Sequence, residues 1–270
     1  MEIPKHLSTE RKVIPFEFNG ETFNFTCMSE RDQYEENQRK LIEEREKRLD
    51  YIKKLKMDSL MDNRFKECKF ENFIISNDNK KYFDFGRYYA YNFDEFKARN
   101  HGLLIYGDPG TGKSYLTFCI ANYLLEKSIP VIACSVSTII EKVREYSTFG
   151  NNKKDQFYNL LKKIDLLIID DLGSENNTEW VNSVLYDVID LRYRSNLPLI
   201  ITTNLEPDTS LKKKLTSSDG VTRTYDRIYE MCRRIKLTCQ PRRIKEGDKK
   251  QAEFNELFKD IKKNGGKLWI

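Results

Sequence analysis

The apolar residues of this chain gather in short uninterrupted runs that are separated by longer segments of mixed polarity. The runs consist mainly of aliphatic residues and occupy 103–106, 131–134, 166–169 and 199–201. Runs of this length and type are typical of strands buried on both faces of a parallel sheet, whose connections are usually helical. The segments between them, such as 115–125 and 138–146, are expected to be helices. The pattern therefore predicts an α/β fold.

A different pattern occupies residues 13–27, where apolar and polar residues alternate on both sides of Asn19-Gly20. Asn-Gly is the strongest two-residue signal for the turn of a β-hairpin. Pairing across this turn places five apolar side chains on one face: Ile14, Phe16, Phe18, Phe23 and Phe25. A lone hairpin is marginally stable in water, so this face is expected to cover the neighbouring helix, the main domain or a partner protein.

A long charged helix is predicted to follow the hairpin. Ser29 and Asp32 form a capped helix start, and the residues from there to about 60 include neither Gly nor Pro. Its apolar residues form only a thin stripe, so the helix is either a solvated surface helix or one that docks by an edge on a partner or coiled coil. We expect residues 1–65 to form a partner-binding appendage and residues 66–270 to form the main domain.

Composition and charge narrow the class of protein. Hydrophobic residues make up 39% of the chain and charged residues 33%, which fits a soluble globular protein. The first residues lack the apolar core of a leader, and no run reaches the roughly 18 apolar residues of a membrane span, so a cytoplasmic protein without membrane contact is expected. Residues 210–270 contain 17 Lys/Arg and 8 Asp/Glu, so the C-terminal quarter is basic. Such a surplus fits either a solvated face or a polyanion-binding surface.

The first apolar run leads directly into GDPGTGKS, residues 107–114, which fits G-x-x-x-x-G-K-[ST] at each fixed position. Glycines let consecutive backbone N–H groups turn inward around phosphate oxygens, and the following helix directs its positive end at them. Lys113 is expected to reach the β- and γ-phosphates of ATP, and Ser114 to bind Mg²⁺. The residues expected to bind the nucleotide are Gly107, Asp108, Pro109, Gly110, Thr111, Gly112, Lys113, Ser114 and Tyr115.

Two later apolar runs end in polar residues that suit the same chemistry. Asp170 and Asp171 follow the run 166–169. An Asp at the end of a strand beside the P-loop strand can hold Mg²⁺ through water, and the next acid can polarise the attacking water. Asn204 ends the predicted strand Pro198–Asn204 and could orient that water, although a lone Asn there is usually a turn residue. We expect three strand ends to converge on one phosphate.

These motifs together resemble those of the AAA+ ATPases, and specifically the DnaC/IstB-type branch of helicase loaders and transposition helpers. GDPGTGKS, LLIIDDLG, TTN and Tyr225-Asp226-Arg227-Ile228 occur in the order seen in that family, within residues 64–245. The branch is indicated by RFKECKFENF before the domain and by Gly173 and Glu175 after the acidic pair. The resemblance implies a core of five parallel strands flanked by helices, with little or no C-terminal lid.

The resemblance also implies roles for single residues. It makes Asp170 the acid linked to Mg²⁺, Asp171 the catalytic acid, Asn204 the first sensor, Arg227 an arginine finger offered to a neighbouring subunit, and Arg243 the second sensor, with Arg242 as the competing choice. Asp171 stands where the family commonly has Glu, and its carboxylate reaches one methylene less far, which puts the turnover rate in question. Residues 240–243 also depart from the usual ending of the branch. An i, i+3 pair with Glu230 is the alternative role for Arg227.

Nucleic-acid contacts are expected by the same resemblance, because loaders hold single strands with basic grooves and aromatic platforms. Tyr146 lies in the insert before the acidic strand, and Thr178 and Trp180 follow that strand on the adjacent loop. All three are in polar surroundings, although single aromatic residues are more often part of a core. The leading hypothesis is a slow ATPase, modulated by DNA or a partner, that assembles into an oligomer and loads a hexameric replicative DNA helicase onto single-stranded DNA. The alternatives are a transposition helper and an ATP-gated adaptor with negligible hydrolysis.

Overall fold

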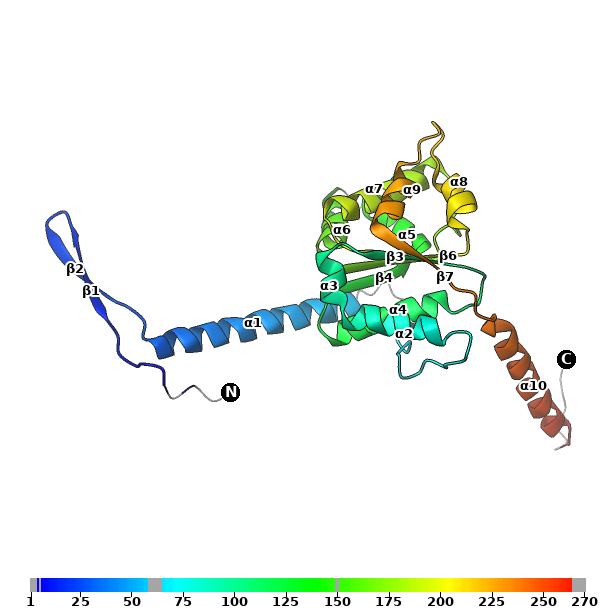
Figure 1. Cartoon of the computed structure of the whole chain (residues 1–270), viewed down its shortest axis with the longest axis horizontal. Helices are drawn as coiled ribbons and strands as arrows, with labels where there is room; N and C mark the ends of the chain where they lie inside the picture. The colour runs from blue at the N-terminus through cyan, green and yellow to red at the C-terminus, as the bar shows by residue number, and fades with distance from the viewer. Residues whose placement is uncertain (1–3, 5, 58–64, 149–150, 264–270) are drawn as a thin grey trace. The chain divides into compact units, whose positions relative to one another are not determined.

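The computed structural model describes residues 4, 6–57, 65–148 and 151–263. The chain divides into two compact units, Met1–Lys54 and Leu55–Ile270 (Figure 1). The predicted boundary after residue 65 adjoins residues 58–64, which fall outside the described residues, and it stays a prediction.

The smaller unit contains the predicted hairpin and the first part of the charged helix. Its elements are β1 (Val13–Phe18), β2 (Glu21–Thr26) and α1 (Glu30–Met57). The strands are antiparallel, and Ile14 pairs with Phe25 and Phe16 with Phe23 across the turn. This register places the five predicted apolar side chains on one face, because directly opposite residues of an antiparallel pair share a face.

The apolar face of the hairpin is exposed. The side chains that form it are 45–60% exposed, and Phe16 contacts Phe18 and Phe25 with ring centroids 6.5 and 6.1 Å apart. The two aromatic contacts give the hairpin local order without covering the face. Exposed apolar surface of this kind is typical of a protein interaction site.

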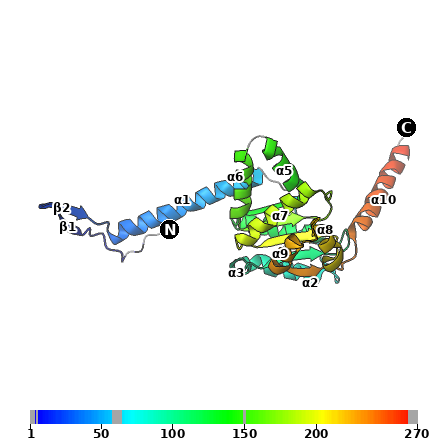
Figure 2. The same cartoon turned by 90° about the horizontal axis from the view of Figure 1, so that it is seen from above.

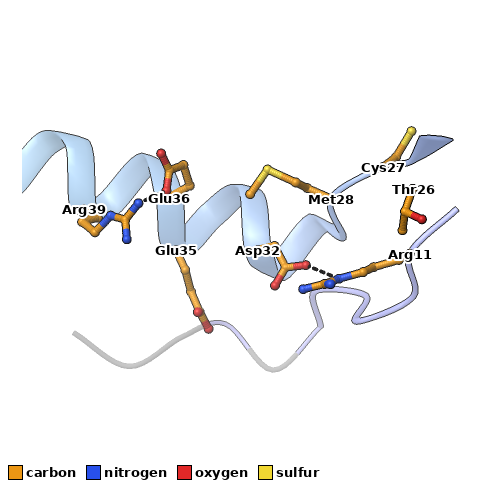
Figure 3. Close-up of a pocket in the computed structure, with 8 residues that line it drawn as sticks. All are labelled: Arg11, Thr26, Cys27, Met28, Asp32, Glu35, Glu36 and Arg39. Atoms are coloured by element: carbon orange, nitrogen blue, oxygen red, sulfur yellow. Dashed lines mark hydrogen bonds and ion pairs between the residues drawn. The ribbon is translucent and has the colours of Figure 1, made fainter.

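The start of α1 is fixed by a reciprocal cap. The Ser29 hydroxyl accepts a hydrogen bond from the backbone N–H of Asp32 at 3.1 Å, and the Asp32 carboxylate accepts one from the backbone N–H of Ser29 at 3.3 Å. Asp32 also pairs with Arg11 at 2.8 Å, on the wall of a pocket of about 390 Å³ that lies between the hairpin and the first turns of α1 (Figure 3). The ion pair lowers the pKa of Asp32. The cap predicted from the sequence is confirmed.

The larger unit is built on a five-stranded parallel sheet. Its strands are β3 (Gly102–Tyr106), β4 (Val131–Ser135), β5 (Leu166–Asp170), β6 (Leu199–Thr203) and β7 (Cys232–Lys236). Their order across the sheet is β4-β5-β6-β3-β7, so the strand before the P-loop lies between β6 and β7 (Figure 1). The first four strands are almost fully buried, as their aliphatic runs predict, whereas β7 is mostly exposed.

Helices cover both faces of this sheet, and the predicted fold class is confirmed. One face carries α2 (Lys80–Tyr91), α3 (Phe93–Ala98) and α4 (Lys113–Glu126), and the other carries α5 (Val136–Thr148), α6 (Asn151–Lys163), α7 (Glu179–Arg194) and α9 (Arg223–Met231) (Figures 1 and 2). The short helices η2 (Pro207–Leu211) and α8 (Lys212–Leu215) join β6 to α9. After β7 the described part of the chain contains one helix, α10 (Arg242–Lys263).

A buried arginine ties three of these elements together. Arg192 of α7 is fully buried and donates hydrogen bonds to four backbone carbonyls, those of Leu161, Ile164, Asp165 and Pro198, at 2.7–3.2 Å. These carbonyls lie at the end of α6 and just before β5 and β6. Burial lowers the pKa of Arg192 to about 10, so the side chain is still charged at neutral pH.

Within the described residues, none of the helices combines the length and hydropathy that a membrane span requires.

Candidate functional site

The P-loop joins β3 to α4 at the carboxyl edge of the sheet. Gly107 has φ 138°, and a Cβ there would collide with the backbone oxygen of Leu237. Gly112 has φ 94° and immediately precedes the first residue of α4. Both positions therefore require glycine, because L side chains rarely adopt such φ values. The loop leaves the N-terminus of a 14-residue helix facing the space that it encloses, and such an end attracts phosphate.

Lys113 is held inside this loop by oxygen atoms. Its Nζ donates hydrogen bonds to the backbone oxygens of Gly107 at 2.8 Å and Asp108 at 2.9 Å, and to Oδ1 of Asn204 at 2.7 Å. The residue is only 6% exposed. These three acceptors are neutral oxygens, and the ammonium charge also stabilises the Asp170 carboxylate electrostatically. The bond to Asn204 links the end of β6 to the P-loop, and the role of Asn204 as a sensor stays a prediction.

Asp170 at the end of β5 faces the first turn of α4. Its carboxylate accepts a hydrogen bond from the Thr202 hydroxyl at 2.6 Å and another from the Ser114 side chain. Burial raises the pKa of Asp170 despite these two hydrogen bonds, and the neighbouring Asp171 raises it further. A buried carboxylate beside a hydroxyl fits the hard oxygen ligands that Mg²⁺ prefers. Ser114 and Asp170 are therefore the residues that would hold the ion, and their role as its ligands stays a prediction.

Asp171 has a different geometry, although it is the next residue. Its φ is 58°, in the left-handed region that only Gly, Asn and Asp enter readily. The Thr202 hydroxyl accepts a hydrogen bond from its backbone N–H at 2.8 Å, and its carboxylate accepts one from Nδ2 of Asn204 at 2.9 Å. Lys113, Asn204 and Asp171 thus form one chain of hydrogen bonds along the strand ends. This arrangement can bind a phosphate and present a carboxylate to a water beside it.

Thr202 is a residue of this site that the sequence reasoning missed. One hydroxyl bonds both the Asp170 carboxylate and the Asp171 backbone, so it fixes the two acids relative to each other. A buried Thr near the end of an otherwise aliphatic strand was the available signal, in the TTN that precedes the sensor position.

The remaining predicted nucleotide contacts lie around the loop. Thr111 donates a hydrogen bond from its hydroxyl to the backbone oxygen of Asp108 at 2.8 Å, which closes the loop locally. The Tyr115 hydroxyl donates to the backbone oxygen of Asn72 at 3.2 Å, and its ring packs edge-on against Phe73 at 5.5 Å. Tyr115 thereby connects α4 to the segment that enters the domain. The side chains of Arg242 and Arg243 lie outside the described part of α10, so the second sensor stays a prediction.

Arg227 of α9 contacts residues of its own chain. Its guanidinium pairs with Asp190 at 2.7 Å and lies over the rings of Tyr186 and Tyr193, 4.7 and 5.5 Å from their centroids. Only 19% of the side chain is exposed. The alternative pairing with Glu230 is not formed: the carboxylate of Glu230 accepts hydrogen bonds from the Tyr193 hydroxyl instead. Asp190 and the two tyrosines therefore hold the predicted finger in one orientation.

The predicted DNA contacts lie at the exposed ends of α5 and α7. Trp180 is 40% exposed, and the Arg144 guanidinium lies over its ring, 5.1 Å from the centroid. Tyr146 is partly buried against the core and packs edge-on against Phe157 at 5.8 Å. The Thr178 hydroxyl caps α7 by accepting a hydrogen bond from the backbone N–H of Val181 at 3.2 Å. Trp180 with Arg144 is thus an open cation–π pair, whereas Tyr146 and Thr178 have structural contacts.

A P-loop beside a strand-terminal acidic pair and a polar sensor residue, on a parallel sheet of this order, defines a P-loop ATPase of the AAA+ class. The family described as the bacterial DnaA ATPase domain matches residues 64–222, more than half of the chain. The chain belongs to this family, and the resemblance to AAA+ proteins inferred from the motifs is confirmed.

Similar proteins include helicase loaders. The replicative helicase loader DnaC of Buchnera aphidicola subsp. Baizongia pistaciae is 30% identical over 146 residues, which are 53% of this chain and 57% of the relative. A crystal structure of the DnaC helicase loader is similar with a TM-score of 0.55 at 21% identity, covering 66% of this chain and all of the other. A replication initiator DnaA bound to AMPPCP and single-stranded DNA gives a TM-score of 0.53 at 22% identity, covering 74% of this chain and 60% of the other. At these identities the structural matches show the fold, and the chain spans little more than half of the curated relative.

Proposed function

We propose that this protein is an ATP-dependent helicase loader, which binds a replicative DNA helicase and single-stranded DNA during the initiation of replication. The observation that carries this proposal is the linkage of Lys113, Asn204 and Asp171 by hydrogen bonds at the strand ends, next to Asp170, in a chain whose relatives are named helicase loaders. The nucleotide site is the reason to propose ATP dependence, and the names of the relatives are the reason to propose a replicative helicase as the partner.

The residues of the site divide the work of ATP hydrolysis among themselves. The P-loop and Lys113 bind the phosphates, and Ser114 with Asp170 holds Mg²⁺, which supplies charge neutralisation at the phosphates when it is bound. Asp171 accepts a proton from the attacking water, and Asn204 orients that water while it fixes the Asp171 carboxylate. Since Asp reaches less far than Glu, slow turnover that DNA or a partner modulates is part of the proposal.

Arg227 completes the site of a neighbouring subunit. It lies on α9, is fixed by Asp190, and has no contact with its own P-loop among the interactions of the described residues. A finger of this kind neutralises charge that develops in the transition state, so hydrolysis should rise when the protein assembles into an oligomer. Trp180 and Arg144 are the residues that we propose to meet single-stranded DNA, because an aromatic ring beside an Arg suits base stacking.

The hairpin forms the surface that binds the helicase. Its five exposed apolar side chains form a face that the described part of its own unit leaves uncovered. The test is copurification of the full chain with the replicative helicase of its own host. Phe16→Ser with Phe23→Ser should lose the helicase, whereas Glu17→Ser with Thr22→Ser, a cross-strand pair on the opposite face, should retain it. If the phenylalanine variant still copurifies with the helicase and its melting temperature is unchanged, the hairpin is not the helicase-binding surface.

An ATP-gated adaptor with negligible hydrolysis is the second candidate, and Asp171 in place of Glu is the observation that favours it. Phosphate release measured with and without single-stranded DNA and helicase separates the two functions. A loader that hydrolyses ATP should release phosphate faster with a partner present. Release at the background rate under all conditions, together with intact nucleotide binding, would select the adaptor.

A further inference from the structure

A groove of about 800 Å³ lies along the exposed edge strand of the sheet, and it shares no lining residue with the nucleotide site. It is bordered by α2 and α3 on one side and by β7 with the start of β3 on the other. The residues that form its apolar floor and walls are Tyr82, Phe85, Tyr88, Phe96, Leu103 and Ile235. Tyr88 is 59% exposed, so part of this apolar surface meets water.

The rim of the groove is basic. Five Lys/Arg side chains line it against one acid, Glu95. Arg234 is neutralised by Asp208 at 2.7 Å, and Lys236 by Glu206 at 3.0 Å. Arg99 and Arg233 are exposed and have no ion-pair partner in the part of the chain that the structure describes. The groove therefore combines an apolar floor with uncompensated positive charge.

The backbone of β7 is open along this groove. In the described sheet, β7 pairs with β3 on one side and with no strand on the other. An unpaired edge presents backbone N–H and C=O groups to any extended chain that lies beside it. Arg233 disfavours pairing with the same strand of a second copy, since like charges directly opposite one another are destabilising. Its charge favours an acidic strand.

We propose that this groove binds an extended acidic peptide segment of a partner protein, which adds a strand to the free edge of β7. Every second side chain of a strand lies on one face, so the groove-facing residues of the added strand would be apolar beside Ile235 and acidic beside Arg233 and Arg99, which border the same groove. Single-stranded nucleic acid fits less well, because Phe96 already packs against Tyr88 and Tyr89, with centroids 6.1 and 4.6 Å away. This inference stands independently of helicase loading and of the hairpin.

The test is a selection of random peptides from a display library on the full-length protein. We expect enrichment of peptides that carry an acidic and an apolar residue two positions apart, and an affinity that falls by about tenfold or more for Arg99→Glu with Arg233→Glu. The matched control is Lys127→Glu with Lys162→Glu, which makes the same change in charge at exposed positions outside the groove. N-methylation of those peptide amides that face β7 should abolish binding, whereas N-methylation of alternate amides should not.

Three results would overturn the proposal. The first is a selection that yields no peptides with an acidic and an apolar residue two positions apart, and the second is equal binding by the groove variant and the control. The third is binding of oligothymidine that depends on Arg99 and Arg233 while the selected peptides are unaffected, which would assign the groove to nucleic acid. Melting temperatures of both variants must match that of the unchanged protein, so that loss of binding reports the groove.

Discussion

At the scale of single residues, the site is organised before any nucleotide enters it. Lys113, Asn204 and Asp171 come from three separate segments and are joined by two side-chain hydrogen bonds of 2.7 and 2.9 Å. Asp170 and Asp171 are joined in turn through Thr202. Groups that already occupy their working positions lose less conformational freedom on binding. Single substitutions in this site are therefore expected to weaken nucleotide binding at some positions and to raise the stability of the protein at others.

Lys113→Ala should abolish ATP binding while the chain stays folded. The substitution removes the charge that meets the phosphates, and Lys113 donates hydrogen bonds to loop carbonyls and Asn204. Calorimetric titration with ATP and Mg²⁺ measures the affinity, and thermal unfolding measures the stability. Lys127→Ala, just after the C-terminal end of the same helix, is the control and should bind normally. Binding by Lys113→Ala as tight as by the unchanged protein would contradict the site.

Asp170→Asn should raise the melting temperature of the nucleotide-free protein and weaken Mg²⁺-dependent nucleotide binding. Burial raises the pKa of Asp170, so the folded state holds its proton more tightly than the unfolded state does, and the ionised carboxylate costs stability at neutral pH. The neutral amide removes that cost, but it is a poor Mg²⁺ ligand.

The stability difference has a defined pH dependence. It should shrink as the pH falls through the raised pKa of Asp170, because the unchanged protein then also carries a neutral side chain. Thermal unfolding as a function of pH, without nucleotide, measures it. A lower melting temperature for Asp170→Asn at neutral pH would show that hydrogen bonds to the carboxylate outweigh its burial.

At the scale of elements, the single side chain of Arg192 supplies hydrogen-bond donors to several segments of the chain at once. The carbonyls that it binds belong to loops that precede two strands of the sheet and to the end of α6. Buried carbonyls without a donor are costly, so these loops depend on one guanidinium.

Arg192→Met should lower the free energy of unfolding by about 3 kcal/mol or more, because it leaves several buried carbonyls without donors. Arg194→Met is the matched control on the same helix. Arg194 is an exposed residue that pairs with Asp190 at 2.8 Å, and its removal should cost less than about 1 kcal/mol. Urea unfolding of the two variants measures the difference. Equal losses would mean that the carbonyls find water or other donors.

The elements also show what could be predicted from the sequence. Four strands were predicted because their burial on both faces requires uninterrupted aliphatic runs. The fifth, β7, was expected only through the family resemblance, because an exposed edge strand that reads CRRIK has no apolar run. The P-loop and acidic pair carry local signatures, whereas the hold of Asp190 on Arg227 joins residues of α7 and α9 that nothing in the sequence links.

At the scale of the whole molecule, the separation of Lys113 and Arg227 makes a test of assembly possible. Arg227→Ala should leave ATP affinity nearly unchanged and lower hydrolysis by about a thousandfold if the finger acts in the transition state. Mixing Arg227→Ala with Lys113→Ala should restore part of the activity, because one subunit then supplies an intact P-loop and its neighbour an intact finger. Phosphate release at several mixing ratios measures it. No restoration, where light scattering shows mixed oligomers, would contradict action across an interface.

The strand order has a consequence for how the chain folds as it is synthesised. β3 carries the P-loop, yet both of its neighbours come much later: Leu103 lies opposite Ile200 of β6 and Arg233 of β7. When the P-loop helix has just left the ribosome, β3 therefore has neither of its neighbouring strands to pair with. Loop closure over such separations is slow, and unpaired strands aggregate. The ATP site of the nascent chain can form only when β6 has emerged, so a chain cut before residue 199 should neither bind nucleotide nor escape chaperones.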